Sequence, residues 1–340
     1  MLAACAVLLI VAAALALCEW IFLGRPVLLE GPPDYSAYYL FRSLALAGLA
    51  AGFVLLVQRH AQRALEPLRP IGWAGQAAIL LSAAIALGAT LLFVMSPEDF
   101  ALVSMEDRQV ESASAAALFL GSAFALLAAI RAYRASSAGA AAMLCGLAGL
   151  LFVIGMEEVS WLQREIGYPT PDWLRMGGRD EANIHNRMTN LSENVYYAGA
   201  VCFLVVLPFI NDFLRPAWRP GWLGRLMPGR TSMLVAAPMA GFTWDMWNVI
   251  PIQLGVFGTL SILAAYAVTA IRTNDPARFL ILIVLLATLL PLCVFLWTGD
   301  AQLRWWNSTE YKELFIALGL FSAAVEMAFA GRERAAIPEA

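Results

Sequence analysis

The chain has 340 residues, of which 61% are hydrophobic and only 14% are charged, and its formal net charge is -3. This apolar content exceeds what the core of a soluble domain of this size buries, so the composition excludes an ordinary soluble protein and predicts an integral membrane protein. We therefore expect membrane lipids as partners, and no nucleic acid.

Apolar runs along the chain predict an all-α fold, because a bilayer core of about 30 Å takes roughly 20 apolar residues per helix. The whole chain, residues 1–340, is interpreted as one integral membrane domain: a polytopic bundle of about ten transmembrane helices. The predicted spans are residues 2–23, 37–58, 72–95, 110–132, 138–159, 192–213, 231–249, 252–271, 277–298 and 310–330.

The first and the seventh predicted spans need separate comment. Residues 2–23 lack a basic leading region and a small-x-small cleavage site, so we interpret them as a retained anchor. Pro238, Gly241 and Pro251 interrupt residues 231–271. This region is predicted to form two short helices, a kinked hairpin or a broken helix that lines a cavity.

The arginines indicate the orientation. Most of the basic residues fall in alternate loops that hold few acids, and these loops are predicted to be cytoplasmic. Both termini are then cytoplasmic as well. A single lysine, many arginines and abundant alanine suggest a bacterial source, so the predicted location is the bacterial inner membrane, crossed several times.

Residues 160–191 form the longest segment between spans and are predicted to be an ordered periplasmic loop. Its stretch "TPDWLRMGG" is typical of a short interfacial helix that Thr170 caps. Several other outer residues have the spacing of helix starts. These are Ser96 before Pro97, Asn190 with Glu193, and Asn307 with Glu310, for which we favour a structural role.

The stretch "GMEEVSWLQR" does not fit a purely structural interpretation. Glu157 and Glu158 end the fifth predicted span, where the helix dipole disfavours carboxylates. If the helix continues, Glu157, Trp161 and Arg164 share one face. The residues then form either a structural Glu–Arg network that holds the 160–191 loop or a functional site, since ionisable residues at membrane depth are often functional.

Two further positions complete the candidate site. His185, between Asn183 and Asn186, precedes the sixth predicted span and is positioned to fold back over the fifth. Together with the glutamates it suits general acid–base catalysis or an incomplete divalent-metal site formed by Glu158 and His185, and no other cofactor is indicated. Asp245, beside Trp244, is predicted near the outer boundary, where it forms either a headgroup platform or part of an interfacial belt.

These residues resemble a group of bacterial polytopic membrane proteins that carry the pattern Glu-Glu-x-Ser-Trp-x-Gln-Arg and, later, Asn-x-His-Asn. The likeness covers about thirty residues and departs from the pattern at Met156 and at Leu162, where a glycine is usual. The resemblance nominates positions and implies no particular reaction. The matching positions are Glu157, Glu158, Ser160, Trp161, Gln163, Arg164, Asn183, His185 and Asn186.

Three functions follow from this sequence. The first is a transferase or hydrolase that acts on a lipid or lipid-linked substrate at the outer leaflet, with Glu157 or Glu158 as base and His185 as partner acid. Substrate would then contact Trp161, Gln163, Arg164, Asn183, Asn186, Trp244 and Asp245. The alternatives are a transporter or channel for a small solute or ion, and a non-catalytic assembly subunit.

Overall fold

The computed structural model consists of helices and connecting loops, and no strand occurs in the part of the chain that it describes. It describes residues 2–24, 28, 30–61, 70–105, 108–170, 183, 189–214, 224 and 226–334. Within these ranges the side chains of residues 2–9, 23 and 330–334 are not described. The all-α prediction is therefore confirmed for the described residues.

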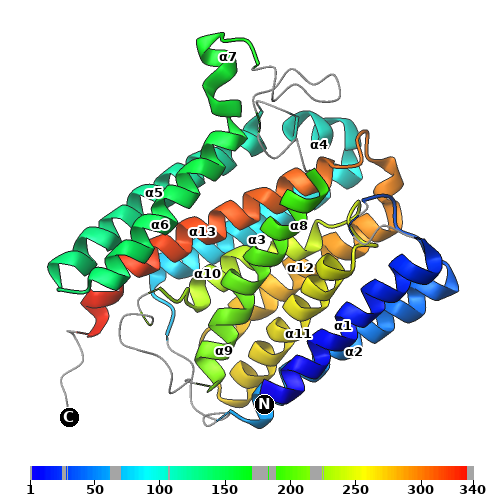
Figure 1. Cartoon of the computed structure of the whole chain (residues 1–340), viewed down its shortest axis with the longest axis horizontal. Helices are drawn as coiled ribbons and strands as arrows, with labels where there is room; N and C mark the ends of the chain where they lie inside the picture. Colours follow the sequence, from blue (N-terminus) through cyan, green and yellow to red (C-terminus); the bar gives the residue numbers. More distant parts are fainter. Residues whose placement is uncertain are drawn as a thin grey trace.

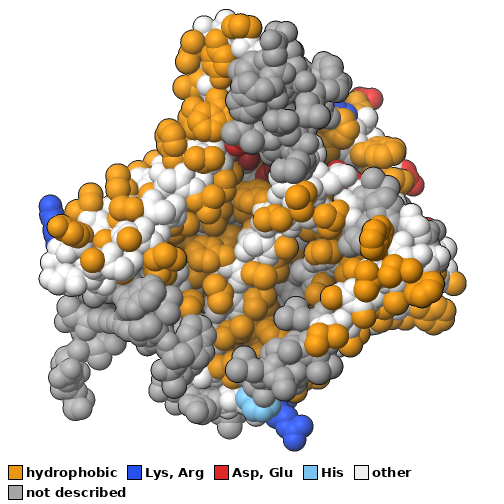
Figure 2. All heavy atoms as spheres, viewed as in Figure 1, with side chains coloured by type: hydrophobic (Ala, Val, Ile, Leu, Met, Phe, Trp, Pro, Cys, Tyr) orange, Lys and Arg blue, Asp and Glu red, His pale blue; other side chains and the backbone are white. Residues whose placement is uncertain are grey.

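Seven helical segments are long and apolar enough to cross a membrane, which supports a multi-pass membrane protein. They follow the long apolar runs of the sequence, and large hydrophobic side chains on their outer faces are exposed, as expected for surfaces in contact with lipid. Figure 2 shows these side chains along the flank of the molecule. The segments are α2 (Ala37–Arg59), α3 (Trp73–Met95), α5 (Gln109–Arg134), α6 (Ala138–Glu158), α8 to α9 (Thr189–Leu214), α11 (Ile250–Arg272) and α12 with η6 (Arg278–Ala301).

The other three predicted spans differ from these seven. The first is a helix, α1 (Leu2–Leu23), but its side chains are described only in part. The last, α13 (Asn307–Arg334), is a 28-residue helix that passes through the interior of the bundle and carries several charges. The seventh is not a full helix: α10 (Arg230–Ala236) and η5 (Ala237–Gly241) are short and buried, and an irregular segment, residues 242–249, leads to α11. The predicted interruption at Pro238 and Gly241 is therefore a break in the helix.

A π-helical turn, η3 (Cys202–Val206), joins α8 (Thr189–Val201) to α9 (Leu207–Leu214). Three further short segments complete the described elements, namely α4 (Pro97–Val103), η1 (Ser160–Leu162) and α7 (Gln163–Ile166). Ser96 caps α4 by accepting a hydrogen bond from the amide of Asp99, with Pro97 in the first turn, as predicted.

The loops gather at two ends of the bundle (Figure 1). One, which we call the acidic end, consists of residues 30–36, 96–105, 159–170, 242–249 and 299–306. Hydrogen bonds hold it together, for example from the amide of Gly31 to the carbonyl of Asp245 and from Asn307 to Ser104. The start of α1 and the end of α13 lie toward the opposite end (Figure 1). The compartment that each end faces remains the assignment predicted from the arginines.

The opposite end is held by a second set of polar contacts. Glu326, near the end of α13, accepts hydrogen bonds from the amide of Gly229 and the hydroxyl of Ser232 at the start of α10. Arg230 pairs with Asp275 at 3.2 Å, and both side chains are buried. These contacts satisfy free amide groups at a helix start and fix α10 against α13, so we assign them a structural role.

Close packing of α13 on α10 provides a test of the fold. A Cβ atom at Gly319 would lie 2.5 Å from Cβ of Ala236 and 2.9 Å from a methyl carbon of Leu204. Gly319→Leu is therefore expected to lower the free energy of unfolding by about 1–3 kcal/mol through overpacking. Gly146→Leu on α6 is the control, because a Cβ atom at Gly146 would meet no other atom within 4 Å. Equal thermal stability of the two variants in detergent would contradict the α10–α13 contact.

Candidate functional site

The fifth predicted span ends in an unusual turn. Helix α6 stops at Glu158, and Ser160, Trp161 and Leu162 have φ angles of 46°, 56° and 60°. The predicted span therefore ends where expected, and the helix does not continue through this stretch, which is the condition for Glu157, Trp161 and Arg164 to share one face. Even so, the indole nitrogen of Trp161 donates to the carboxylate of Glu157, so these two predicted site residues are in contact.

Three consecutive left-handed residues with side chains are costly, at about 1–2 kcal/mol each. Such strain persists only where surrounding contacts impose it, and it is concentrated at functional sites. The turn is anchored by Gln163, whose buried amide donates to the hydroxyl of Thr170, and by Tyr168, whose hydroxyl donates to the carbonyl of Trp161. It redirects the chain directly after Glu157 and Glu158.

Glu158 faces acidic residues from three helices. Glu158 is partly buried. Four other carboxyl groups repel its charge, and in decreasing order of the strength of this repulsion they are those of Glu313, Glu310, Glu111 and Glu157. The hydroxyl of Tyr196 is buried beside Glu158 and Glu313, and it has no hydrogen-bond partner in the part of the chain that the structure describes. Repulsion among close carboxylates favours a proton shared within the group or a cationic partner.

A second set of groups, which we call the inner cluster, consists of Glu30, Glu193, Asp245 and Lys312. The carboxyl groups of Glu193 and Glu30 are close neighbours, and a proton shared between them would relieve the repulsion of two adjacent carboxylates. Glu193, Asp245 and Glu30 all act electrostatically on the ammonium of Lys312. Four distant segments of the chain therefore meet at this point.

Asp245 lies in the loop before α11 and is 3% exposed. Both of its carboxylate oxygens accept hydrogen bonds from the hydroxyl of Thr309 at 2.7 Å. Burial raises the pKa of Asp245 to about 6, while the ammonium of Lys312 and the hydroxyl of Thr309 oppose this rise. Asp245 is thus a carboxyl group that titrates near neutral pH, as acid–base catalysts do.

Lys312 is the only lysine in the sequence and is 3% exposed. Its ammonium lies 4.6 Å from the ring centre of Tyr197 and 3.5 Å from the sulfur atom of Met246. Among the described residues no oxygen atom is within hydrogen-bonding distance of it. The strongest hydrogen bonds that an ammonium forms, those to charged oxygen acceptors, are therefore not made here.

Lys312 also lines a small apolar cleft. Its volume is about 20 Å³, and its walls come from α8, η5, α11 and α13, with Tyr197 and Thr243 among the lining residues. The walls include Ala198, Val201, Ile252, Gly255, Val256 and Ile316. A cleft of this size has room for about one water molecule, whereas ligand pockets hold about 300–1,000 Å³.

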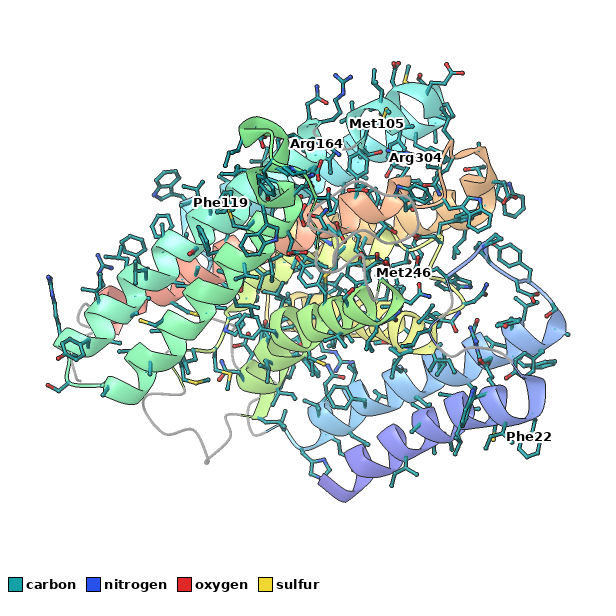
Figure 3. The ribbon with its side chains drawn as sticks, turned by 45° about the horizontal axis from the view of Figure 1, so that its top comes forward. Phe22, Met105, Phe119, Arg164, Met246 and Arg304 are labelled. Carbon is teal, nitrogen blue, oxygen red and sulfur yellow. The ribbon has the colours of Figure 1, made fainter. Side chains whose placement is uncertain are left out.

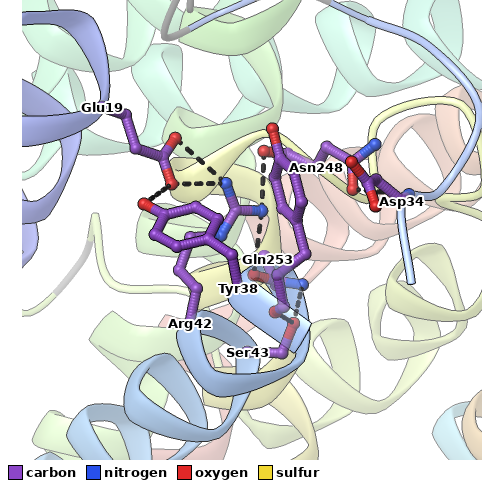
Figure 4. A network of polar contacts seen from close by, with 8 residues as sticks. Glu19, Asp34, Tyr38, Arg42, Ser43, Asn248 and Gln253 are labelled. Carbon is purple, nitrogen blue, oxygen red and sulfur yellow. Dashed lines mark hydrogen bonds and ion pairs between the residues drawn. The ribbon is translucent and has the colours of Figure 1, made fainter. Parts of the chain in front are cut away.

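A polar network positions the loop that carries Asp245 (Figure 4). Arg42 on α2 pairs with Glu19 on α1 at 2.9 Å and donates to the carbonyl of Asn248 at 2.8 Å. The side chain of Asn248 donates to the carbonyl of Pro32 and accepts from the amide of Asp34. Because these bonds join residues 30–34 to residues 242–248, they place Glu30 beside Asp245.

No family model, curated protein or solved structure matches this chain. The resemblance described above therefore remains a likeness over about thirty residues.

Other predicted site residues lie at the same end of the bundle. Figure 3 shows Arg164, Met105 and Arg304 there. Arg164 is exposed, and Asn183 is buried, with no hydrogen-bond partner for its side-chain oxygen among the described residues. Trp244 is buried against Gly299 and is not among the residues that line the cleft. His185 and Asn186 lie outside the described residues, so their roles remain predictions.

A metal site at Glu158 and His185 also remains a prediction. No group of three or more His, Cys, Asp or Glu side chains suited to holding a metal ion occurs in the described part of the chain. The described part contains Glu158 but not His185, which is the ligand that the prediction requires.

Glu30, Glu193 and Lys312 of the inner cluster are not identified by sequence reasoning. The spacing of Glu193 predicts a capping box, but its carboxyl group lies beside that of Glu30. A useful signal for Lys312 is present in the sequence: a lone lysine among arginines, at the polar start of the tenth predicted span. Outside the cluster, Asn307, predicted to cap with Glu310, instead donates to Ser104 and accepts from the amide of Arg304.

Proposed function

We propose that this protein is a membrane enzyme, a transferase or hydrolase, that acts on a lipid or lipid-linked substrate at the acidic end of its bundle. The observation that carries the proposal is the meeting of Glu30, Glu193, Asp245 and Lys312 beside an apolar cleft. Buried ionisable residues in membrane proteins mark functional sites. We assign the protein to the bacterial inner membrane, with this end facing the periplasm, from the arginine distribution.

We assign the acid and base roles to two pairs of neighbouring carboxyl groups. With one shared proton, the Glu193–Glu30 pair is suited to give and take a proton during a group transfer. Glu158 and Glu157 form the other half of the site, with Glu158 as base and His185 as the partner acid proposed from the sequence.

Substrate contacts are assigned around these pairs. Trp161 and Gln163 belong to the strained turn, and Arg164 follows it. With Asn183, Asn186 and Asp245 they supply polar contacts, whereas Trp244 supports the loop that carries Asp245. The lipid-facing apolar side chains of the bundle surround these acids, so the apolar part of a lipid substrate stays in the bilayer while its head group reaches the acidic end.

The test is a comparison of membrane lipids in cells that carry Glu158→Gln or Glu193→Gln. Loss of a general acid or base costs about 10²- to 10⁴-fold in rate, so one lipid or lipid-linked glycan is expected to accumulate and its product to disappear. Glu98→Gln is the matched control, since Glu98 is an exposed glutamate at the same end. Lipid mass spectrometry gives the readout, and unchanged profiles in both variants would overturn the enzymatic proposal.

A transporter is the second candidate, and the break between η5 and α11 favours it. Discontinuous helices often form the binding sites of secondary transporters, and here the irregular segment 242–249 carries Asp245. Altered uptake of a solute or ion, with an unchanged lipid profile, in Asp245→Asn would support this candidate over the enzyme. A non-catalytic assembly subunit predicts neither change.

A further inference from the structure

The first two turns of α13 carry polar residues on two neighbouring faces. Thr309 and Lys312 are three residues apart and share one face, and Glu310 and Glu313 share the next one. The first face meets the inner cluster, because the hydroxyl of Thr309 donates to Asp245 and the ammonium of Lys312 attracts the same carboxylate. The second face is therefore turned away from most of this cluster.

The second face of α13 meets other acids, which we call the outer group: Glu111 on α5, Glu158 at the end of α6, and Glu310 itself. The carboxyl groups of Glu310 and Glu111 both repel that of Glu158. Glu310 and Glu111 lie in the first turns of their helices at the acidic end and are partly exposed. Water at this end of the bundle therefore has access to the outer group.

Glu313 lies between the two groups. Its carboxyl group repels Glu158 more strongly than Glu310 does, and it also acts on Glu193 and Lys312 of the inner cluster. The hydroxyl of Tyr197 donates to a carboxylate oxygen of Glu313 at 2.5 Å, and the ring centre of Tyr197 lies 4.6 Å from the ammonium of Lys312. Because Tyr197 is 2% exposed, it holds Glu313 from a fixed position beside the inner cluster.

We propose that Glu313 is a proton relay between the outer group and the inner cluster, and that Tyr197 holds it in place. A proton passes from Glu310 to Glu313, which breaks an O–H bond on the first carboxyl group and forms one on the second. It then passes from Glu313 to Glu193 in the same way. The carboxylate left on Glu310 takes a new proton from water at the acidic end, so only O–H bonds change.

This inference rests on the proposed function, in which the Glu193–Glu30 pair gives and takes a proton during each group transfer. The pair must recover its original protonation state before the next turnover. Asp245 and Lys312, beside this pair, are each 3% exposed, so bulk water has little access to this part of the cluster. Glu313 provides the path for recovery and acts through Glu193, so it is a positioning residue and does not itself touch substrate.

The experiment follows proton uptake by Asp245 in the purified full-length chain in detergent, by time-resolved infrared spectroscopy after a light-triggered drop in pH. A protonated carboxyl group has a C=O stretching band that a carboxylate lacks, and the band that Asp245→Asn removes identifies this residue. A drop from about pH 7 to about pH 5 protonates Asp245, whose pKa is about 6. Asp245 acts electrostatically on Glu193, so its band reports the arrival of a proton in the inner cluster.

The variants change the relay and leave its surroundings in place. Glu313→Gln keeps an acceptor for the hydroxyl of Tyr197 but has no transferable proton, so uptake is expected to slow at least about 10-fold. Glu313→Asp is expected to restore part of the rate. Tyr197→Phe keeps the ring beside Lys312 and removes only the hydroxyl, and it is expected to slow uptake less than Glu313→Gln does. Glu98→Gln, at an exposed glutamate of the same end, is the control and is expected to match wild type.

The rate and the equilibrium midpoint separate a relay from a merely structural role. Slower uptake in Glu313→Gln, with the midpoint of the Asp245 band moved by less than about 0.5 pH unit, supports the relay. Uptake at the wild-type rate would overturn it, because protons would then reach Asp245 by another path. A larger shift of the midpoint would also overturn it, since Glu313 would then set only the local charge. Thermal denaturation identifies any variant that fails to fold, and Tyr197→Phe keeps the relay testable if Glu313→Gln does not fold.

This experiment needs no substrate, so it and the lipid-profile test fail independently. A changed lipid profile in Glu193→Gln, together with wild-type uptake in Glu313→Gln, refutes the relay and leaves the enzymatic proposal standing. Slow uptake in Glu313→Gln, together with unchanged profiles in Glu158→Gln and Glu193→Gln, supports the relay and refutes catalysis.

Discussion

Replacing Arg42 with methionine is expected to lower the free energy of unfolding by about 3–5 kcal/mol, the effect of breaking a buried ion pair. Arg42 and Glu19 have side chains that are 1% and 5% exposed, and one guanidinium nitrogen lies 2.9 Å from a carboxylate oxygen of Glu19. The other terminal nitrogen donates to the carbonyl of Asn248. The variant would leave a buried carboxylate unpaired and also free the loop that carries Asp245.

Two controls accompany this prediction, which unfolding with denaturant in detergent micelles would check. Arg272→Met removes an exposed arginine at the end of α11 and is expected to change stability by less than about 0.5 kcal/mol. The double variant Glu19→Gln with Arg42→Met removes both charges and is expected to recover part of the loss. If Arg42→Met were no less stable than Arg272→Met, the network in Figure 4 would not hold α1, α2 and the 242–249 loop together.

The sequence is sufficient to predict the helices, because their main determinant is local. An apolar run of about 20 residues has few alternatives to a membrane helix. The ends of the runs at residues 37–59, 73–95 and 278–298 agree closely with the predicted spans. The break near Pro238 is also predictable, because proline removes a backbone donor and glycine favours irregular backbone.

The turn after Glu158 is not predictable from local rules. Ser160, Trp161 and Leu162 each prefer right-handed backbone, and nothing in their identity favours three positive φ angles in succession. The contacts that impose this conformation include Tyr168 and the Gln163–Thr170 bond, which form only when the following residues fold back. Local helical periodicity therefore does not apply between Glu157 and Arg164, although the contact between Glu157 and Trp161 is present.

The inner cluster depends on distant pairings that periodicity does not encode. Glu193 has the spacing of a helix cap, and only the position of Glu30, more than 150 residues earlier in the chain, gives it a different partner. Lys312 and Asp245 meet because the helix that begins at Arg230 breaks and the following segment reaches the start of α13. The sequence identifies acidic outer ends, and the packing selects which acids are buried together.

The pH dependence of stability is expected to report on Asp245. Burial raises its pKa from 3.8 to about 6, so folding favours its protonated form. This contribution to stability is complete below pH 3.8 and is lost as the pH rises through about 6. A rise of about two pH units corresponds to about 3 kcal/mol, so the free energy of unfolding is expected to fall by this amount between about pH 4 and pH 7.

Comparison with Asp245→Asn isolates this effect from the titration of other carboxyl groups, because asparagine does not titrate. Lys312, Thr309, Glu30 and Glu193 surround Asp245, and Lys312 is the neighbour that most favours its ionised form. Lys312→Met is therefore expected to move the loss of stability to higher pH. The test is the free energy of unfolding of wild type, Asp245→Asn and Lys312→Met, measured between about pH 4 and pH 7. If wild type and Asp245→Asn show the same pH dependence, Asp245 is ionised throughout this range and does not exchange protons near neutral pH.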